Sequence, residues 1–399
     1  MMKVNKWTLG LAAVGLVTLP AGLQAEEQMS ALQTALSSTT ISGYVDASAQ
    51  WAIGTTKNGA PPGYAFNTPS KQDGFNLNVV NLTIERALDP QDNWAAGYKI
   101  DMIYGPNAAN WNPSANLLTG MDSDFALKQA YVAMRAPVGN GLDFKLGTFD
   151  TIIGYEVFHA GNNPNYTRSY GYTSEPTQHT GLLASYQFCK EFGVAGGVAN
   201  TANAGINSRS WLANGNKSET DKTYLGAMTL TAPESWGWVA GSTLYGGVVS
   251  GWNTSADNGQ TWYYAGATFN TPVTGLKVGA AYDYNSLNGS AASFNPTKTW
   301  FNAVAGYVSY QATEKLSLHG RVEYVWMDDE LVFEGDAETP SNGLDNSILG
   351  VTGTIQYDLW ANVLSRIEFR WDKACGGGKP FFTEDENAFL LAANVIYKF

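Results

Sequence analysis

In five stretches of the chain, charged side chains of opposite sign stand an even number of positions apart. In chain order these are Lys99 and Asp101, Asp143 and Lys145, Lys277 and Asp283, Arg321 and Glu323, and Arg366, Glu368 and Arg370. Successive side chains of a β-strand point to opposite faces, so residues an even number apart share one face. Such a face could line a pore and set up a transverse field across it. Alternatively, the opposite charges simply neutralise one another inside a hydrated barrel.

The longest predicted loop, from Phe149 to His179, is the second feature that could act on a solute. It carries many aromatic side chains, and its candidate functional residues are Tyr155, Glu156, His159, Arg168 and Glu175. A loop this aromatic is expected to pack against other protein, so it could fold inward and narrow a lumen. The alternative is a surface loop packed on its neighbours or on a second subunit.

The residues that most enzymes need are scarce. There are three histidines, His159, His179 and His319, and the sequence contains no Gly-x-Ser-x-Gly or His-Glu-x-x-His motif. The two cysteines, Cys189 and Cys375, have no metal-ligand spacing and are predicted at opposite rims, too far apart to pair. We therefore expect no catalytic site, no metal and no cofactor.

Period-2 alternation of apolar and polar residues defines the elements that would position these side chains. In the last stretch, Phe389 to Phe399, an apolar residue stands at every second position up to the end of the sequence. The same reading predicts sixteen strands. They are Ile41 to Trp51, Phe75 to Glu85, Ala96 to Tyr104, Ala126 to Arg135, Leu142 to Thr148, Thr180 to Tyr186, Phe192 to Ala199, Thr223 to Thr231, Trp238 to Val249, Thr261 to Asn270, Leu276 to Asn285, Thr299 to Tyr310, Leu316 to Trp326, Ile348 to Tyr357, Val363 to Asp372 and Phe389 to Phe399. A change of phase at Val79 and Val80 predicts a β-bulge.

The predicted connections alternate between short and long along the chain. Ala232 to Gly237, for example, is a short turn, and Gly251 to Gln260 is a longer loop. Outer-membrane barrels have short periplasmic turns and longer outer loops, whereas a soluble β-sandwich has no reason to alternate. The expected fold is therefore an all-β transmembrane antiparallel up-and-down β-barrel of about sixteen strands. Aromatic residues near the strand ends, such as Trp51, Trp371 and Tyr357, would form two interfacial girdles.

Composition agrees with a barrel wall that faces lipid. Charged residues make up only 15% of the chain, aromatic residues 13%, and the mean hydropathy is −0.19. Soluble domains usually have about a quarter of their residues charged. The formal charge of −12 disfavours nucleic acid as a partner.

The start of the sequence reads as an export signal. Lys3 and Lys6 precede the apolar run Trp7 to Leu19, and cleavage after Ala25 is expected, which predicts a signal peptide over 1–25. Its removal would change the formal charge to −14, because both lysines are lost. Residues 26–40 would form a short periplasmic leader, and 41–399 the barrel in the bacterial outer membrane.

Several segments together resemble a known family. They are Lys145 to Thr151 with Gly154-Tyr155-Glu156, Thr167 to Tyr170, Pro176 with His179-Thr180-Gly181, Arg321 to Tyr324, and Arg366 to Asp372. They are similar to the second β-barrel porin family, the OmpL-like outer-membrane proteins, along nearly the whole exported chain. Ile367 stands where that family's strand is expected to have a proline. The resemblance implies a passive porin, and it identifies no solute-binding residues.

The function predicted from the sequence is passive diffusion of small hydrophilic solutes through the outer membrane. The alternative is a structural or adhesive barrel with a closed pore. Expected partners are outer-membrane lipid and small solutes. The chain could also form a homo-oligomer, which the sequence does not decide. One long loop holds seven acidic residues and no basic one: Asp328, Asp329, Glu330, Glu334, Asp336, Glu338 and Asp345. These acids predict a weak preference for cations at low salt. The equal alternative is that they bind divalent ions that bridge to surface lipid.

Overall fold

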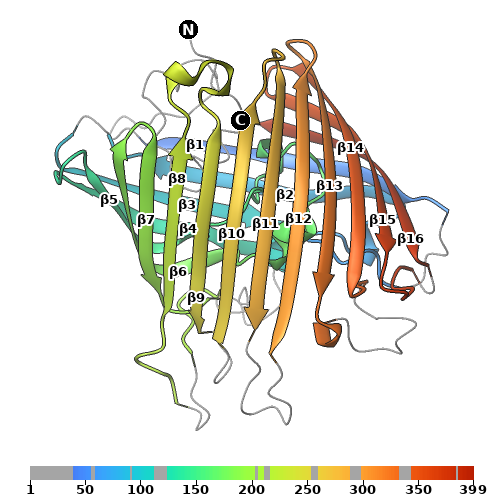
Figure 1. Ribbon diagram of the computed structural model, residues 1–399, viewed down its shortest axis with the longest axis horizontal. Coiled ribbons are helices and arrows are strands. Elements are labelled where there is room, and N and C mark those ends of the chain that lie inside the picture. Colours follow the sequence, from blue (N-terminus) through green and yellow to red (C-terminus); the bar gives the residue numbers. More distant parts are fainter. Residues whose placement is uncertain are drawn as a thin grey trace.

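The computed structural model describes residues 39–54, 59–89, 92–111, 124–202, 205–210, 216–252, 259–287, 298–331, 343–382 and 385–399. Sixteen strands in these residues close into one barrel (Figure 1). The strands are β1 (Thr40–Ala52), β2 (Gly74–Arg86), β3 (Ala95–Tyr104), β4 (Phe125–Ala136), β5 (Leu142–Asp150), β6 (Gln178–Cys189), β7 (Phe192–Ala199), β8 (Thr223–Thr231), β9 (Thr243–Trp252), β10 (Gly259–Asn270), β11 (Leu276–Leu287), β12 (Thr299–Gln311), β13 (Leu316–Met327), β14 (Ser347–Trp360), β15 (Val363–Ala374) and β16 (Asn387–Lys398).

Every strand pairs antiparallel with its neighbours in sequence, and β1 closes the ring by pairing with β16. Ala47 lies opposite Val395 at that seam. The predicted fold class, an all-β up-and-down barrel of sixteen strands, is thus confirmed. Closure leaves no unpaired strand edge, which a wall inside lipid requires because hydrocarbon offers no hydrogen bonds.

The alternation seen in the sequence matches the two faces of the wall. In β16, Phe389, Leu391, Val395 and Tyr397 are exposed on the outside, and the residues between them are buried inside. The same pattern holds in β15, where Ile367 and Phe369 are exposed between buried arginines and a buried glutamate. Apolar side chains on the outer face are expected where the wall meets lipid.

The predicted β-bulge in β2 is confirmed. The register between β1 and β2 shifts between Asp46 and Ala47, so that Val79 and Leu77 pair with them and Asn78 between is left over. Phe75 and Leu77 are exposed before the shift, and Asn78 and Val79 are both buried at it. The extra residue therefore moves the outward phase of the strand by one position.

The predicted start of the ninth strand at Trp238 is wrong. The connection between β8 and β9 runs over residues 232–242 and contains a 3₁₀ helix, η4 (Glu234–Val239), with Gly237 at φ 65°. Trp236 and Trp238 are exposed there. The alternating Trp-Gly-Trp pattern imitates a strand, but a left-handed glycine turns the backbone instead. The strict alternation of short and long connections fails here, because only residues 253–258 separate β9 from β10.

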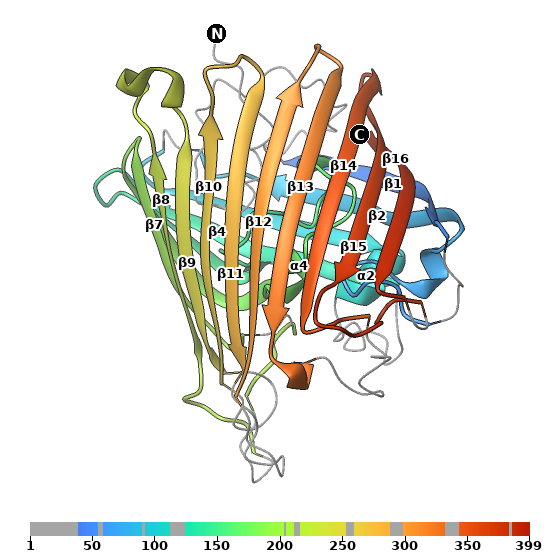
Figure 2. The ribbon, with the colours of Figure 1, turned by 45° about the vertical axis from the view of Figure 1, so that its right-hand side comes forward.

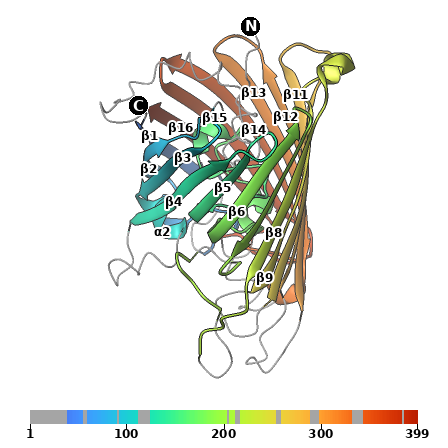
Figure 3. The same ribbon diagram turned by 90° about the vertical axis from the view of Figure 1, so that its left-hand side faces the viewer.

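The remaining helices are short and belong to connections: η2 (Pro69–Lys71), α2 (Pro106–Trp111), η3 (Ala160–Asn162), α4 (Tyr170–Ser174) and η5 (Asp329–Leu331). None of the helices in the described ranges is both long and apolar enough to cross a bilayer. Figures 2 and 3 show the segment that carries α4 inside the ring of strands. The two cysteines are free and exposed, at the end of β6 and just after β15. The predicted signal peptide and nearly all of the leader lie outside the described residues.

Candidate functional site: a loop anchored inside the barrel

The connection from β5 to β6, residues 151–177, lies inside the barrel, and we call it the inner loop. It starts in an apolar root, where Ile152 and Ile153 are buried in a cluster with Tyr245, Val249 and Trp262 from β9 and β10. The turn behind them needs glycine: Gly154 has φ 116°, and a Cβ there would lie 2.2 Å from Glu175 Oε2. Burial of these isoleucines fixes the direction in which the loop enters the lumen.

The root ends in an aromatic contact with β12. The rings of Tyr155 and Tyr307 stack with centroids 4.0 Å apart. Tyr307 Oη then donates a hydrogen bond of 3.2 Å to Glu156 Oε1, the next residue of the loop. Tyr307 therefore touches both the apolar root and the polar part that follows.

The tip of the inner loop, Asn165–Tyr170, is held by charged side chains of the wall. Glu368 on β15 accepts hydrogen bonds from the backbone N–H of Tyr166 (2.5 Å) and of Thr167 (2.9 Å), and from Thr167 Oγ1 (2.6 Å). Backbone N–H groups at the tip have no strand to pair with, so a carboxylate satisfies them.

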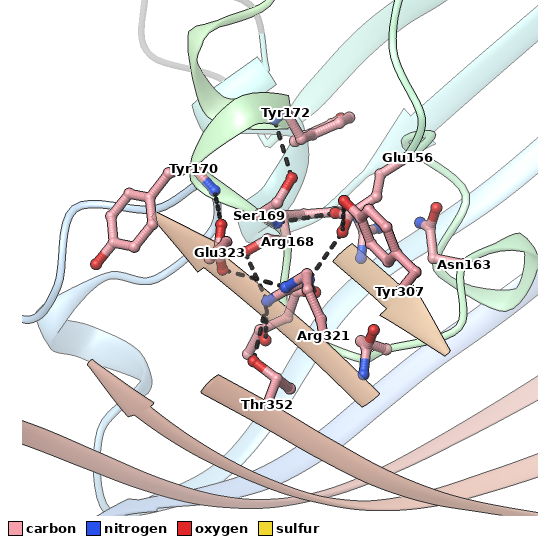
Figure 4. A network of polar contacts seen from close by, with 12 residues as sticks. Glu156, Asn163, Arg168, Ser169, Tyr170, Tyr172, Tyr307, Arg321, Glu323 and Thr352 are labelled. Atoms are coloured by element: carbon pink, nitrogen blue, oxygen red, sulfur yellow. Dashed lines mark hydrogen bonds and ion pairs between the residues drawn. The ribbon is translucent and has the colours of Figure 1, made fainter. Parts of the chain in front are cut away.

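Arg321 and Glu323 on β13 hold the same tip from a second strand (Figure 4). Arg321 Nη1 lies 2.8 Å from Glu156 Oε1 and 2.9 Å from the carbonyl oxygen of Thr167. Glu323 Oε1 lies 3.1 Å from Arg321 Nε, and its Oε2 accepts the backbone N–H of Tyr170 at 2.7 Å. Each buried charge therefore has an opposite charge and a loop backbone group as partners.

Arg370 on β15 completes this set. Its Nη1 donates to the carbonyl oxygen of Arg168 at 2.7 Å, and its Nε and Nη2 bond with Asp372. The guanidinium also lies over the ring of Tyr64, 3.6 Å from the centroid. Tyr64 belongs to the connection between β1 and β2, so two different loops meet on one arginine.

Arg366 on β15 binds the middle of the inner loop through carbonyl oxygens. Its Nη1 lies 2.9 Å from the carbonyl oxygen of Ala160, and its Nη2 lies 2.5 Å from that of Asn163. These carbonyls come from η3 and the residue that follows it. A planar guanidinium suits this role because it presents several donors in a fixed geometry.

His159 contacts the wall at β3 and β1, which follow β15 and β16 around the barrel. Its Nε2 lies 3.1 Å from Asp101 Oδ2 on β3, and its Nδ1 lies 3.2 Å from Tyr44 Oη on β1. Burial is the largest influence on its pKa and lowers it, although the Asp101 carboxylate acts in the other direction. Asp101 is also close to Lys128 Nζ, at 3.8 Å.

Glu175, at the end of the inner loop, forms a pair of carboxyl groups with Asp283 on β11. The two side chains are buried and hydrogen-bonded to each other. Burial, and then the neighbouring negative charge of Asp283, raise the pKa of Glu175 well above its usual value. A pair of this kind holds a shared proton, because two carboxylates so close cannot both ionise easily.

The other sequence candidates on the wall do not contact the inner loop in these interactions. Lys99 lies 3.7 Å from Glu85, and Asp143 is bonded to Arg135 at 2.6 Å. Lys145 lies over the ring of Tyr131. Lys277 lines a cavity near the turns. The structure therefore gathers Asp101, Asp283 and the charges of β13 and β15 around the loop, leaves Lys99, Asp143 and Lys145 apart, and places Lys277 in a cavity that the loop also lines.

Two cavities lie on either side of the inner loop. The loop-side cavity, of about 20 Å³, is lined by Gln50, Tyr64, Phe66, Lys71, Ala160 and Arg168 among others. The turn-side cavity, of about 50 Å³, is lined by Gly161, Asn162, Lys277, Gln311, His319 and Gln356 among others. Ala160 and Gly161 are neighbours in sequence but line different cavities, so this short piece of backbone separates them.

The connection between β1 and β2 also contributes to the site, and the sequence did not predict this contribution. Tyr64 and Tyr170 meet edge to face at 5.9 Å, and Lys71, which is buried, donates a hydrogen bond to Asn107 Oδ1 at 2.6 Å. Neither residue stands in an alternating pattern, so no signal in the sequence marked them. Among the described residues, no group of three or more His, Cys, Asp or Glu side chains could hold a metal ion.

A closed barrel of sixteen antiparallel strands, wide enough to admit a long folded loop, is the architecture of an outer-membrane porin. Residues 38–399 match the family described as "Putative beta-barrel porin-2, OmpL-like". The chain belongs to this family, and it is a porin of the bacterial outer membrane. The resemblance inferred from the sequence is confirmed.

Solved structures show the same fold at low sequence identity. The outer-membrane channel DcaP of Acinetobacter baumannii is similar with TM-score 0.59 and 11% identity, over 92% of this chain and 99% of that chain. The anion-selective porin from Comamonas acidovorans has TM-score 0.57 and 9% identity, over 91% and 99%. OmpF of Salmonella typhi, in complex with daunomycin, has TM-score 0.57 and 10% identity, over 90% and 97%. No curated protein sequence matches the chain significantly.

Proposed function

We propose that this porin is a passive diffusion channel for small hydrophilic solutes, and that the inner loop sets the size of solute it admits. The observation that carries the proposal is the inner loop itself, fixed across the lumen between a cavity on the loop side and a cavity on the turn side. Family membership supports the channel class, and that class speaks against an enzyme.

The narrowest point is proposed to lie at Ala160 and Gly161, the backbone that separates the two cavities. Arg366 binds the carbonyl oxygen of Ala160, so this constriction is fixed to the wall. The pore-lining candidates of the sequence then divide by role. Arg321, Glu323, Arg366, Glu368 and Arg370 shape the passage by holding the loop, whereas Lys277 faces a cavity directly.

The test is conductance of the refolded, signal-free protein in planar bilayers, combined with cysteine labelling. Cys189 and Cys375 are replaced by serine, and Ala65→Cys and Asn162→Cys then place one thiol in each cavity. Discrete conductance steps are expected, with a step decrease when a charged thiol reagent modifies either position. The cysteine-free protein is the control and should not respond. Folded protein that never conducts would overturn the proposal.

The second candidate is the structural or adhesive barrel with a closed pore. It is favoured by the small volumes of the two cavities, about 50 and 20 Å³, which hold only a few water-sized groups. The same recordings decide, because a closed barrel gives no steps and no labelling of Asn162→Cys from the loop side.

We further propose a weak cation preference at low salt, set by the acidic connection between β13 and β14. Of its seven acids, Glu334, Asp336 and Glu338 lie outside the described residues. The Debye length is about 8 Å at physiological salt, so the preference should decline as salt is added. Reversal potentials in a salt gradient measure it, and a clear anion preference at low salt would contradict it. Loss of the preference on adding Ca²⁺ would instead indicate acids that bind divalent ions.

We also propose that the protein forms a homo-oligomer, and we assign no interface among the described residues. Cross-linking of the protein in vesicles tests this proposal.

A further inference from the structure

Two buried hydrogen-bond donors belong to residues that line the loop-side cavity and have no partner among the described residues. Gln50 and Arg168 line it and are 2% and 3% exposed. Gln50 Nε2 and Arg168 Nε have no hydrogen-bond partner among the described residues. Buried donors without partners are costly, at about 1–3 kcal/mol each, unless a ligand or water satisfies them.

Lys71 adds a third buried side chain that carries hydrogen-bond donors. Its ammonium group has three N–H donors, and one of them bonds with Asn107 Oδ1 at 2.6 Å. Lys71 is buried and lines the cavity with Gln50 and Arg168.

Two side-chain acceptors that line the cavity already receive hydrogen bonds from other protein groups. Asp46 Oδ1 accepts from the amides of Asn78 (2.9 Å) and Asn394 (2.6 Å). Gln50 Oε1 accepts from Tyr166 Oη at 3.2 Å. The charged groups that line the cavity are two cations, Lys71 and Arg168, and one acid, Asp46. Their formal sum is one positive charge, and the spare donors are those of Gln50 and Arg168.

From this arrangement we infer that the loop-side cavity binds the carboxylate group of a small monocarboxylate solute. A carboxylate has two oxygens that accept several hydrogen bonds, which matches the spare donors of Gln50 and Arg168 and the ammonium group of Lys71. The cavity volume of about 20 Å³ fits one small polar group and not a whole sugar. The rings of Tyr64 and Phe66 also line the cavity and would contact the apolar part of the solute.

The inference deepens the proposed channel function, because it names the class of solute that pauses above the constriction. It does not need an open pore, since binding in the cavity can be measured on folded protein that does not conduct. Failure of the site and failure of the channel are therefore separate results.

The test is calorimetric titration of the folded barrel in detergent with propionate, and with propionamide as a neutral ligand of the same shape. Propionate should bind, and propionamide should bind at least about tenfold more weakly. Lys71→Gln should weaken propionate about tenfold, the loss expected for one charged hydrogen-bond donor. Lys277→Gln is the matched control, because it removes the same charge from the other cavity and should change the affinity less than twofold.

Lys71→Arg keeps the positive charge and should retain most of the affinity, which guards against a folding defect in Lys71→Gln. Burial lowers the pKa of Lys71 to about 8, against the opposing charge of Asp46, and Arg168 adds to the lowering. The affinity for propionate should therefore fall as the pH rises through about 8. Absence of propionate binding, equal binding of propionamide, or equal losses in Lys71→Gln and Lys277→Gln would each overturn the inference. Competition by chloride at the same concentrations would assign the site to any small anion and also overturn it.

Discussion

The two parts of the inner loop are held by different chemistry. The root is held by apolar packing, with Ile152 and Ile153 against aromatic and aliphatic residues of β9 and β10. The tip is held by buried charges on β13 and β15 that bond with its backbone. Apolar packing is non-directional, whereas hydrogen bonds to charged groups require a specific geometry. The comparison indicates that the root provides docking energy and that the tip defines the shape of the passage.

The largest effect is expected from Arg321→Ala. This substitution leaves Glu156 buried without its cationic partner, whereas Glu323 keeps Arg370 Nη2 at 3.2 Å, and the loss of one member of a buried ion pair costs about 3–5 kcal/mol. Hydrogen exchange of loop peptides, followed by mass spectrometry, should show lost protection over 165–172 and a larger, noisier conductance.

Arg135→Ala is the matched control for that variant. Arg135 also forms a two-point ion pair, with Asp143, but near the turns and away from the inner loop. The expected loss of loop protection is small, because neither Arg135 nor Asp143 bonds with the inner loop in these interactions. Equal loss of loop protection in both variants would show that the charges of β13 have no special relation to the tip.

Ile153→Ala tests the root. Removal of a buried isoleucine side chain beyond Cβ costs about 2–5 kcal/mol, depending on how far the site collapses. Protection should fall first over 152–157, while the tip keeps its bonds to Glu368. Simultaneous loss over the whole loop would mean that root and tip form one cooperative unit, which breaks the comparison.

Gly247, on β9 of the wall, provides a second variant that tests the root. A Cβ at Gly247 would lie 2.6 Å from Ile153 Cγ2, so Gly247→Ala overfills the root. The double variant with Ile153→Ala should cost less than the sum of the two single variants, because the new methyl group occupies part of the cavity. Strictly additive costs would argue that the two residues do not meet.

The pH should change how strongly the end of the inner loop is docked, through the carboxyl group of Glu175. Its docked pKa is raised above the usual value, so the docked loop keeps a proton that the released loop loses. Docking is therefore strongest at low pH and weakens as the pH rises from about 4.5 toward the raised pKa, by up to about 1.4 kcal/mol per pH unit. Asp283 and Glu156 are the charged groups that act on it.

Glu175→Gln checks the sign of this prediction. The amide resembles the protonated acid, so the variant should keep its protection near 171–177 at every pH between 5 and 8. The native protein should lose protection there as the pH rises. Protection that increases with pH in the native protein would contradict the assignment of a shared proton.

The sequence predicted the wall of the barrel well and the anchoring of the loop poorly, for physical reasons. Alternation is a local property, because lipid and lumen act on successive residues of every strand. Contact between Glu368 and Thr167 joins residues about two hundred positions apart, and nothing in either segment names the other. Lys71 was missed because it stands in a connection without periodicity. The strand start at Trp238 was wrong because a tryptophan on each side of a glycine imitates strand alternation.

The smallest effect, and the sharpest test of where the two parts of the loop join, is expected from Tyr307→Phe. The variant keeps the ring that stacks on Tyr155 but removes the hydrogen bond to Glu156 Oε1, for a cost of about 1 kcal/mol. Arg321 Nη1 bonds with that same oxygen, so two donors share one acceptor. In a double-mutant cycle measured by hydrogen exchange, Tyr307→Phe should therefore cost more in Arg321→Ala than in the native protein, because Tyr307 Oη is then the remaining donor to Glu156 Oε1. An unchanged cost would mean that Tyr307 belongs to the root alone, and the boundary between root and tip would then lie between Tyr155 and Glu156.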